Sequence, residues 1–482
     1  MQERGFVNMI ENKKEKMKKS TTNRDKRNSN FSKDKGKKPK VQNRQMAAQG
    51  NKKQQDKKEE QMSKKRSNHF HLKENNAQNI NRKKNINSVK DNKKKDSVKK
   101  NAICAISKKC GACQMIGTPY EEQLKIKQKK MKKLLGSFGP VEHIIGMEQP
   151  YYYRNKVHAV YHRKRSGEVV AGVYEAGTHR VVPVTKCYIE NEKADEIVQS
   201  SLGLMKSFKV KIYNEDAGYG LMRHILIRVA QSTGEIMVVF VTANPMFPSK
   251  NNFIKALLKL HPEITTIVQN INDKQTNMIL GERENVLYGK GYIEDILCGK
   301  KFRISPKSFY QVNSVQTEIL YKKAIQLADL KNKETIIDAY CGIGTISIIA
   351  SKAAKEVIGV ELNPDALKDA KINAKRNGID NVSFYNEDAG DFMVSLAEAG
   401  KKIDVVFMDP PRSGSDEKFL SSVLRLLPKK IVYISCGPDT LARDLEYLEK
   451  SGKYKVKKIC PVDLFPFTEH TECVVWIQKQ HM

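Results

Sequence analysis

The sequence lacks any long apolar run, and this absence limits the classes to which the chain can belong. No stretch reaches the ~20 apolar residues that a membrane-spanning helix needs. The first 20 residues contain no continuous apolar core of the kind found in a secretory signal. The nine cysteines are an odd number, and several lie in strand-like or glycine-rich contexts. A disulfide framework is therefore disfavoured, and we expect a cytoplasmic protein in a reducing compartment.

Acidic residues are also scarce, since 54 Asp and Glu stand against 87 Lys and Arg. The imbalance is concentrated in residues 1–100, where 32 Lys and Arg stand against 11 Asp and Glu. This block is rich in Lys, Asn, Gln and Ser, so it cannot bury enough apolar surface to offset chain entropy. We predict a disordered basic arm that suits a polyanion, above all nucleic acid. A solubilising tail without a specific partner is the alternative.

The remaining chain changes pattern once. From 150 to 300, short alternating runs separated by turn residues predict a mainly antiparallel β region with some helix. From 308, strands and helices alternate, which predicts βαβ units and a parallel sheet with helices on both faces. The predicted fold class is α/β, with a central mixed α+β domain over 101–307. A doubly wound, Rossmann-like domain over 308–482 follows it.

Ligands of a doubly wound sheet bind at the carboxyl ends of its strands. The stretch "IIDAYCGIGTISI" (336–348) runs from a strand through Gly342 and Gly344 into a helix, and glycines allow a ligand to approach the backbone. Glu361 ends the next strand, where a carboxylate can accept hydrogen bonds from ribose hydroxyls. The loop lacks the full G-x-G-x-x-G spacing, so an adenosine-bearing cofactor is favoured over a dinucleotide. Asp388 is either an adenine contact or a helix N-cap.

Two further strands end in reactive side chains. Asp409 ends the strand "VVFMD" and is followed by two prolines, which make a rigid loop. Arg412 in that loop can bind phosphate or negative charge developing on a ring. The apolar run "KKIVYIS" ends at Cys436, directly before Gly-Pro. A core cysteine would lie inside such a run, so the position of Cys436 favours chemistry over packing.

Three ordered motifs, "DPPRSG", "YISCGPDTLARD" and "DLFPFTEHTE", resemble those of the RNA uracil-5-methyltransferase family. Such enzymes transfer a methyl group from S-adenosylmethionine to C5 of a uridine in 23S rRNA or tRNA. The resemblance covers 101–482 and implies Cys436 as nucleophile and Glu472 as general base, with Glu469 as the second candidate base. The residues that it implies for cofactor binding are Gln311, Tyr340, Glu361 and Asp409. The sequence departs from the family at Gly437 and Thr345, where asparagine is usual or common.

The chemistry of the family explains these residue types. A thiolate of Cys436 adding to C6 of uracil pushes electron density onto C5, so one hard step becomes two easier ones. After C5 takes the methyl group, a base such as Glu472 removes the C5 proton and the thiolate leaves. A cation lowers a thiol pKa, and Arg412 is the candidate. The target uridine must be single-stranded or flipped out of a helix.

Four cysteines upstream suggest a metal centre. They are Cys104, Cys110, Cys113 and Cys187. Zinc is the general expectation for four thiolates, whereas the family resemblance implies a [4Fe–4S] cluster with a structural or RNA-facing role. The cluster resembles the 23S rRNA branch, because bacterial tRNA-modifying members typically lack it. Many rRNA members begin with a small β-barrel, and no strand set for one precedes Asn101, so the basic arm is expected to supply phosphate affinity.

Three other functions fit less well. A dehydrogenase has no use for the paired prolines or for Cys436. A cytosine-5 RNA methyltransferase would carry a second cysteine in the loop "MDPPRSG", which has none. A non-catalytic RNA-binding protein would need neither Cys436 nor Glu472. The predicted reaction is therefore uracil-5 methylation of 23S rRNA, with tRNA as the alternative substrate.

Overall fold

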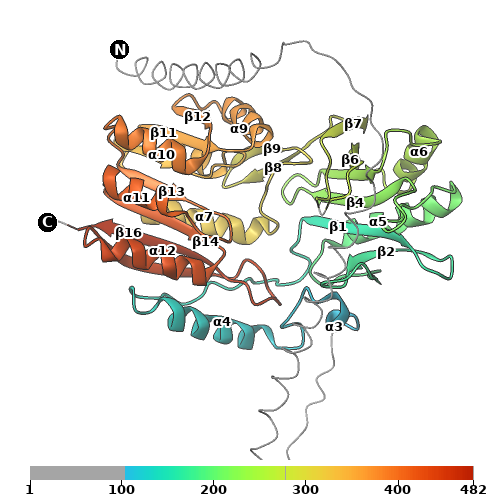
Figure 1. Cartoon of the computed structure of the whole chain (residues 1–482), viewed down its shortest axis with the longest axis horizontal. Helices are drawn as coiled ribbons and strands as arrows, with labels where there is room; N and C mark the ends of the chain where they lie inside the picture. Colours follow the sequence, from blue (N-terminus) through green and yellow to red (C-terminus); the bar gives the residue numbers. More distant parts are fainter. Residues whose placement is uncertain (1–103, 277, 481–482) are drawn as a thin grey trace, which may run out of the picture. The chain divides into compact units, whose positions relative to one another are not determined.

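The computed structural model of the chain describes residues 104–276 and 278–480 (Figure 1). They belong to one compact unit, Lys100–Met482. The predicted disordered arm over 1–100 lies outside the described residues. The boundary predicted between 307 and 308 stays a prediction. No helix in the described ranges combines the length and apolarity that crossing a membrane requires.

A mainly antiparallel sheet forms in the first half of the unit, as the alternating runs predict. Its strands, in the order β3-β2-β1-β4-β5-β6-β7, are Val181–Pro183, Val169–Tyr174, Lys156–Arg163, Met222–Val229, Ile236–Thr242, Ile264–Ile271 and Arg283–Tyr288. Only β5 and β6 pair in parallel, across helix α6 (Lys250–Leu260). Helices α5 (Glu192–Ser207) and α6 pack on this sheet and share its apolar core. All seven residues of β5 are buried, which fits an apolar strand in the interior of the sheet, with neighbours on both sides.

The second sheet is the predicted doubly wound sheet with an antiparallel addition. Its strands, in the order β12-β11-β10-β13-β14-β16-β15, are Val382–Asn386, Glu356–Glu361, Thr335–Asp338, Val405–Met408, Lys430–Ser435, Glu472–Lys479 and Tyr454–Val462. The first five pair in parallel. Strand β16 enters between β14 and β15 and runs antiparallel to both. The α/β fold class is confirmed.

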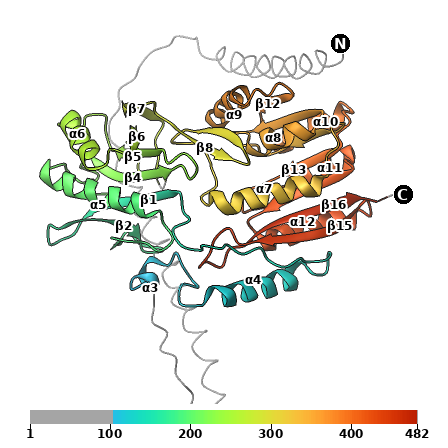
Figure 2. The same ribbon diagram turned by 180° about the vertical axis from the view of Figure 1, so that it is seen from behind.

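Helices cover both faces of the second sheet. On one face lie α7 (Ser314–Ala328), α8 (Thr345–Ala350) and α9 (Pro364–Arg376), whose apolar residues share a core with the strands (Figure 2). On the other lie α10 (Ala389–Glu398), α11 (Glu417–Leu426) and α12 (Pro438–Lys450) (Figure 1). This arrangement leaves the carboxyl edge of the parallel strands open for a ligand.

A hairpin and two helices lie outside the two large sheets and the helices just described, and a short 3-10 helix (Ser351–Ala353) follows α8. Strands β8 (Ile293–Leu297) and β9 (Lys300–Ile304) form a hairpin beside α9. Helix α3 (Ser107–Cys110) lies in the cysteine-rich segment, residues 104–115. Helix α4 (Tyr120–Leu135) packs against α12 and β15 of the second sheet, although it precedes them by more than 300 residues.

Candidate active site

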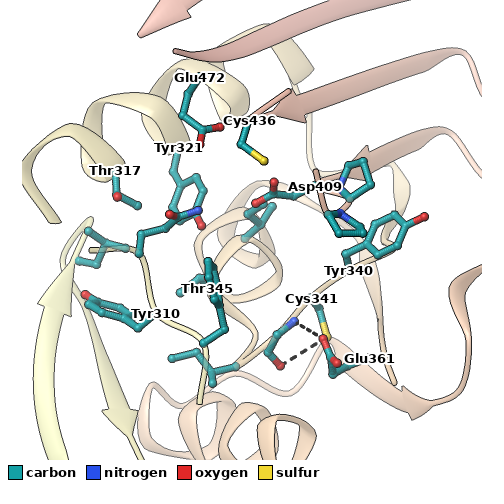
Figure 3. A pocket seen from close by; sticks show the side chains of 18 of the residues that line it. Tyr310, Thr317, Tyr321, Tyr340, Cys341, Thr345, Glu361, Asp409, Cys436 and Glu472 are labelled. Atoms are coloured by element: carbon teal, nitrogen blue, oxygen red, sulfur yellow. Dashed lines mark hydrogen bonds between the residues drawn. The ribbon is translucent and has the colours of Figure 1, made fainter. Parts of the chain in front are cut away.

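A pocket of about 420 Å³ opens at the carboxyl edge of the second sheet (Figure 3). It gathers seven of the eight residues predicted to bind cofactor or substrate or to catalyse. These seven are Gln311, Tyr340, Glu361, Asp409, Arg412, Cys436 and Glu472. Figure 3 shows Cys436 and Glu472 pointing into one end of the pocket with Asp409 beside them, while Tyr340 and Glu361 lie toward the other end. The pocket therefore has two ends with different chemistry.

The cofactor end is built from the glycine loop and Glu361. Gly342 and Gly344 have φ of +55° and +81°, which favour glycine. The amide of Gly342 donates to Glu361 Oε2 at 2.9 Å, and the amide of Asn363 donates to Glu361 Oε1 at 2.7 Å. Open space surrounds the Cβ position of Gly342, so a ligand can approach the backbone there. A carboxylate fixed in this way is placed to accept hydrogen bonds from a ribose.

Asp338 does not line the pocket, but it supports the glycine loop of the cofactor end, and sequence reasoning missed this role. It ends β10 and is fully buried, and burial raises the pKa of its carboxyl to about 6. The amide and hydroxyl of Ser347 donate to Asp338 Oδ2 at 2.9 and 2.6 Å. Asp338 therefore ties the first turn of α8 to the strand that precedes the loop. Its place at a strand end was the available signal.

The catalytic end depends on strand register. In the antiparallel ladder of β14 and β16, Ser435 pairs with Cys473. The ladder ends at this pair, so Cys436 directly follows the last residue of β14 and Glu472 directly precedes Cys473 on β16, and both side chains line the pocket. Glu472 pairs with Val462 of β15, which fixes its backbone on that side. An inserted antiparallel strand thus brings the predicted nucleophile and the predicted base together.

Burial dominates the electrostatics of the catalytic end. It raises the pKa of Glu472 to about 8, with the nearby Asp409 adding to the rise and Arg412 opposing it. Burial and Asp338 raise the pKa of Asp409 to about 7. The pKa of the Cys436 thiol rises to about 11 through burial, Glu472 and Asp409. Arg412 lowers that pKa as expected, but its effect does not outweigh burial, so the free thiol is protonated at neutral pH.

The departure at Gly437 has a local structural reason. Gly437 lies between Cys436 and the first turn of α12, and a Cβ there would meet Thr440 Oγ1 at 2.7 Å. That hydroxyl donates to the carbonyls of Arg412 and Gly437 at 3.1 and 3.0 Å. The bonds tie the proline loop to the turn that holds Cys436. Glycine at 437 allows this close approach.

Two predicted residues lie away from the pocket lining. Asp388 is the N-cap of α10 and accepts a hydrogen bond from the amide of Asp391 at 3.1 Å, which is the alternative stated above. Its contact with an adenine stays a prediction. Glu469 is exposed and is absent from the lining, unlike Glu472. Sequence reasoning also missed Thr317, Tyr321 and Phe465, which line the pocket but have spacing typical of a helix or loop.

The four predicted metal ligands line a second pocket of about 380 Å³. Burial raises the pKa of Cys113 to about 11 and that of Cys187 to about 12, as expected for thiols removed from water. The donor chemistry fits a tetrathiolate centre. Within residues 104–276 and 278–480, however, no three His, Cys, Asp or Glu side chains are close enough to hold a metal ion. The metal centre therefore stays a prediction.

A doubly wound sheet with a glycine loop, an acid at the next strand end and an open carboxyl edge is the architecture of S-adenosylmethionine-dependent methyltransferases. A family model described as tRNA (Uracil-5-)-methyltransferase matches residues 119–480. The chain belongs to this family of RNA uracil-5-methyltransferases. It is an S-adenosylmethionine-dependent enzyme that methylates RNA.

Relatives and a solved structure agree with this assignment. The chain is 42% identical over 386 residues to an uncharacterized RNA methyltransferase of Bacillus cereus, covering 79% of this chain and 84% of the relative. It is 44% identical over 376 residues to one of Clostridium tetani, covering 77% and 81%. The structure of Pyrococcus abyssi tRNA (uracil-54, C5)-methyltransferase with S-adenosyl-L-homocysteine is similar at a TM-score of 0.64 and 26% identity. That match covers 76% of this chain and 85% of the other.

Proposed function

We propose that the chain methylates C5 of a uridine through a covalent adduct between Cys436 and C6 of the base. The observation that carries this proposal is that Cys436 and Glu472, which adjoin the last pair of the β14–β16 ladder, line the same end of one pocket. Glu361, Tyr340 and Gln311 would hold S-adenosylmethionine at the other end. When bound, this cofactor supplies the electrophilic methyl group.

The residues act in a defined order. The Cys436 thiolate attacks C6 and forms the C6–S bond, and the electron pair of the C5–C6 double bond moves toward C5 and the O4 carbonyl. After C5 is methylated, the Glu472 carboxylate takes the C5 proton. The C5–H pair restores the double bond, and the C6–S pair leaves with Cys436.

The raised pKa values of Cys436, about 11, and Glu472, about 8, favour the protonated forms at pH 7, so Cys436 must lose its proton before it attacks C6 and Glu472 must lose its proton before it takes the C5 proton. Arg412 and the N-terminus of α12 favour the thiolate. A base pKa of about 8 suits Glu472, since catalytic bases work best with a pKa near the operating pH.

The test uses RNA that contains 5-fluorouridine together with S-adenosylmethionine. Fluorine at C5 cannot leave as a cation, so the adduct cannot break down and the protein should be trapped on the RNA. Denaturing gels should show a stable complex with the wild-type protein and none with Cys436→Ala. No complex with the wild type, or an equal yield from Cys436→Ala, would refute the covalent mechanism.

We further propose 23S rRNA as the substrate and a cytoplasmic location. The four cysteines support the rRNA branch, because they match the ligand set that the family resemblance implies for it. The second candidate is tRNA, favoured by the similarity to a tRNA (uracil-54, C5)-methyltransferase. Mapping of 5-methyluridine in rRNA and tRNA from a deletion strain separates the two, since only the true substrate loses the modification.

A [4Fe–4S] cluster held by Cys104, Cys110, Cys113 and Cys187 is part of this proposal, with zinc as the alternative. The support is the set of four thiols lining one pocket. Protein purified without oxygen should contain about four iron and four sulfide per chain. The variant Cys110→Ser should lose both the iron and the sulfide. Bound zinc without sulfide would favour the alternative.

A further inference from the structure

Residues 463–471 form the loop that joins β15 to β16 and ends directly before Glu472. The strands close at the pair Val462 and Glu472, so the loop begins and ends at the catalytic end of the pocket. Phe465, within the loop, also lines the pocket. The shape of this loop therefore helps to set where the carboxylate of Glu472 lies.

The loop backbone is held by groups from outside it. Five successive carbonyls, of residues 463 to 467, each accept a hydrogen bond of 2.9–3.1 Å. The donors, in order, are Gln316, Asn313, Lys127, Tyr153 and the amide of Met115. The amide of Phe467 donates to Gln123 at 2.9 Å. Lys127 is the one charged donor in this set.

Lys127 makes a buried ion pair as well as its bond to the loop backbone. Its Nζ lies 2.6 Å from Asp463 Oδ1 and 3.1 Å from the carbonyl of Phe465. The two side chains are 1% and 0% exposed. The hydroxyl of Tyr120 donates to Asp463 Oδ2 at 3.0 Å, so both carboxylate oxygens of Asp463 are bonded to α4. Both ends of the loop segment 463–465 are thus fixed to one helix.

The position of Lys127 on α4 makes the charge unusual. The buried residues of this helix are spaced by four, at Gln123, Lys127, Met131 and Leu135, where an apolar stripe is expected. Burial lowers the pKa of Lys127, and Asp463 opposes that fall. An apolar pair of similar volume often makes a protein at least as stable as a buried ion pair does, so stability alone does not account for these charges. An ion pair differs from an apolar pair in fixing the direction of the contact, and this property accounts for the charges.

We propose that Lys127 is a positioning residue that acts through Asp463 and the Phe465 carbonyl to place Glu472. This inference rests on the proposed function, in which Glu472 removes the C5 proton. Attack by Cys436 depends instead on β14 and the Gly437 turn. Loss of Lys127 should therefore slow breakdown of the adduct and spare its formation.

The test compares Lys127→Met with Lys129→Met, a change at an exposed lysine of the same helix. With ordinary uridine RNA and S-adenosylmethionine, Lys127→Met should turn over at least tenfold more slowly and accumulate a methylated covalent complex. With 5-fluorouridine RNA, it should form the trapped adduct at the wild-type rate. Lys129→Met should match the wild type in both assays.

A second variant separates position from folding. Lys127→Met alone leaves the Asp463 carboxylate buried without its partner, so Lys127→Met combined with Asp463→Leu removes both charges. This double variant should unfold near the wild-type temperature and still accumulate the complex. The proposal is overturned by wild-type turnover, by equal slowing of both steps, or by failure of the double variant to fold, since the pair would then serve the fold. Failure of the wild type to form any adduct refutes the proposed function instead.

Discussion

At the residue scale, Glu472 and Glu469 lie three positions apart but in different surroundings. Glu472 is buried in the pocket, whereas Glu469 is exposed. Glu472→Gln keeps the shape of the side chain and removes the base, so turnover should fall by about 10²–10⁴-fold. The methylated adduct with ordinary uridine RNA should accumulate, as measured on denaturing gels. Glu469→Gln is the matched control and should turn over like the wild type. If the adduct accumulates in Glu469→Gln and not in Glu472→Gln, Glu469 is the base.

The raised pKa of Glu472 also links stability to pH. Its carboxyl has an ordinary pKa of 4.5 and a folded value of about 8. The folded state thus binds the proton more tightly, and stability from this group is present below pH 4.5 and is lost as pH rises toward 8. Each unit of pKa difference is about 1.4 kcal/mol.

Glu472→Gln stays neutral at every pH, so it should be more resistant to urea than the wild type at pH 8.5. At pH 4.5 the two urea midpoints should be close. Glu469→Gln, with its exposed side chain, should follow the wild type at both values. If the urea midpoints of the wild type and Glu472→Gln differ by the same amount at both pH values, burial does not protonate Glu472.

At the element scale, the glycine loop between β10 and α8 is the most demanding turn of the site. Gly344 has φ +81°, and a Cβ there would meet Phe384 Cζ at 3.0 Å. Gly378 has φ +63° with open space around its Cβ position, so a change to alanine there tests the cost of the backbone conformation alone. Gly378→Ala should cost about 1–2 kcal/mol. Gly344→Ala should lower the free energy of unfolding by more than Gly378→Ala does, because its Cβ would also meet Phe384. It should also weaken binding of S-adenosylmethionine, which titration calorimetry can measure. Equal losses of stability in the two variants would show that the contact with Phe384 adds no cost.

Much of the second sheet could be predicted from the sequence, because alternating strands and helices specify parallel pairing. The loop at Gly342 and the acid at Glu361 follow from the same pattern. The insertion of β16 could not be predicted, since strand periodicity is the same for parallel and antiparallel neighbours. The meeting of Cys436 and Glu472 therefore came from family resemblance, not from spacing. The burial of Lys127 could not be predicted for another reason, because a lysine in a basic helix normally faces solvent.

At the scale of the whole molecule, the catalytic end depends on residues far away in the sequence. Lys127 and Asp463 are separated by 336 positions, and Met115 of the cysteine-rich segment bonds to Phe467. Phe467 belongs to a small apolar cluster of buried residues, and Cys104, Cys113 and Cys187 pack against this cluster. The segment that carries the cysteines and the loop that precedes Glu472 therefore share one core. Residues 308–482 on their own would lack these contacts.

The charge of the chain leads to a prediction about RNA binding. Residues 1–100 carry 32 Lys and Arg against 11 Asp and Glu, a balance of +21 out of the total of +33. Contacts between cations and phosphates release counterions, so the slope of log affinity against log salt reports their number. Deleting 1–100 should weaken RNA binding and flatten this slope, as filter binding between 50 and 200 mM salt can measure.

A full-length variant with the arm's Lys and Arg replaced by Gln, and its Asp and Glu replaced by Asn and Gln, is the matched control, because it keeps the length of the arm and removes its charge. It should behave like the deletion if phosphate contacts are what the arm supplies. Turnover at saturating RNA should change little in either variant, since the pocket residues all lie after residue 296. An unchanged salt slope in both variants would leave the arm as a solubilising tail. A flattened slope in the deletion alone would contradict the prediction, since the loss of slope would then not follow the charge of the arm.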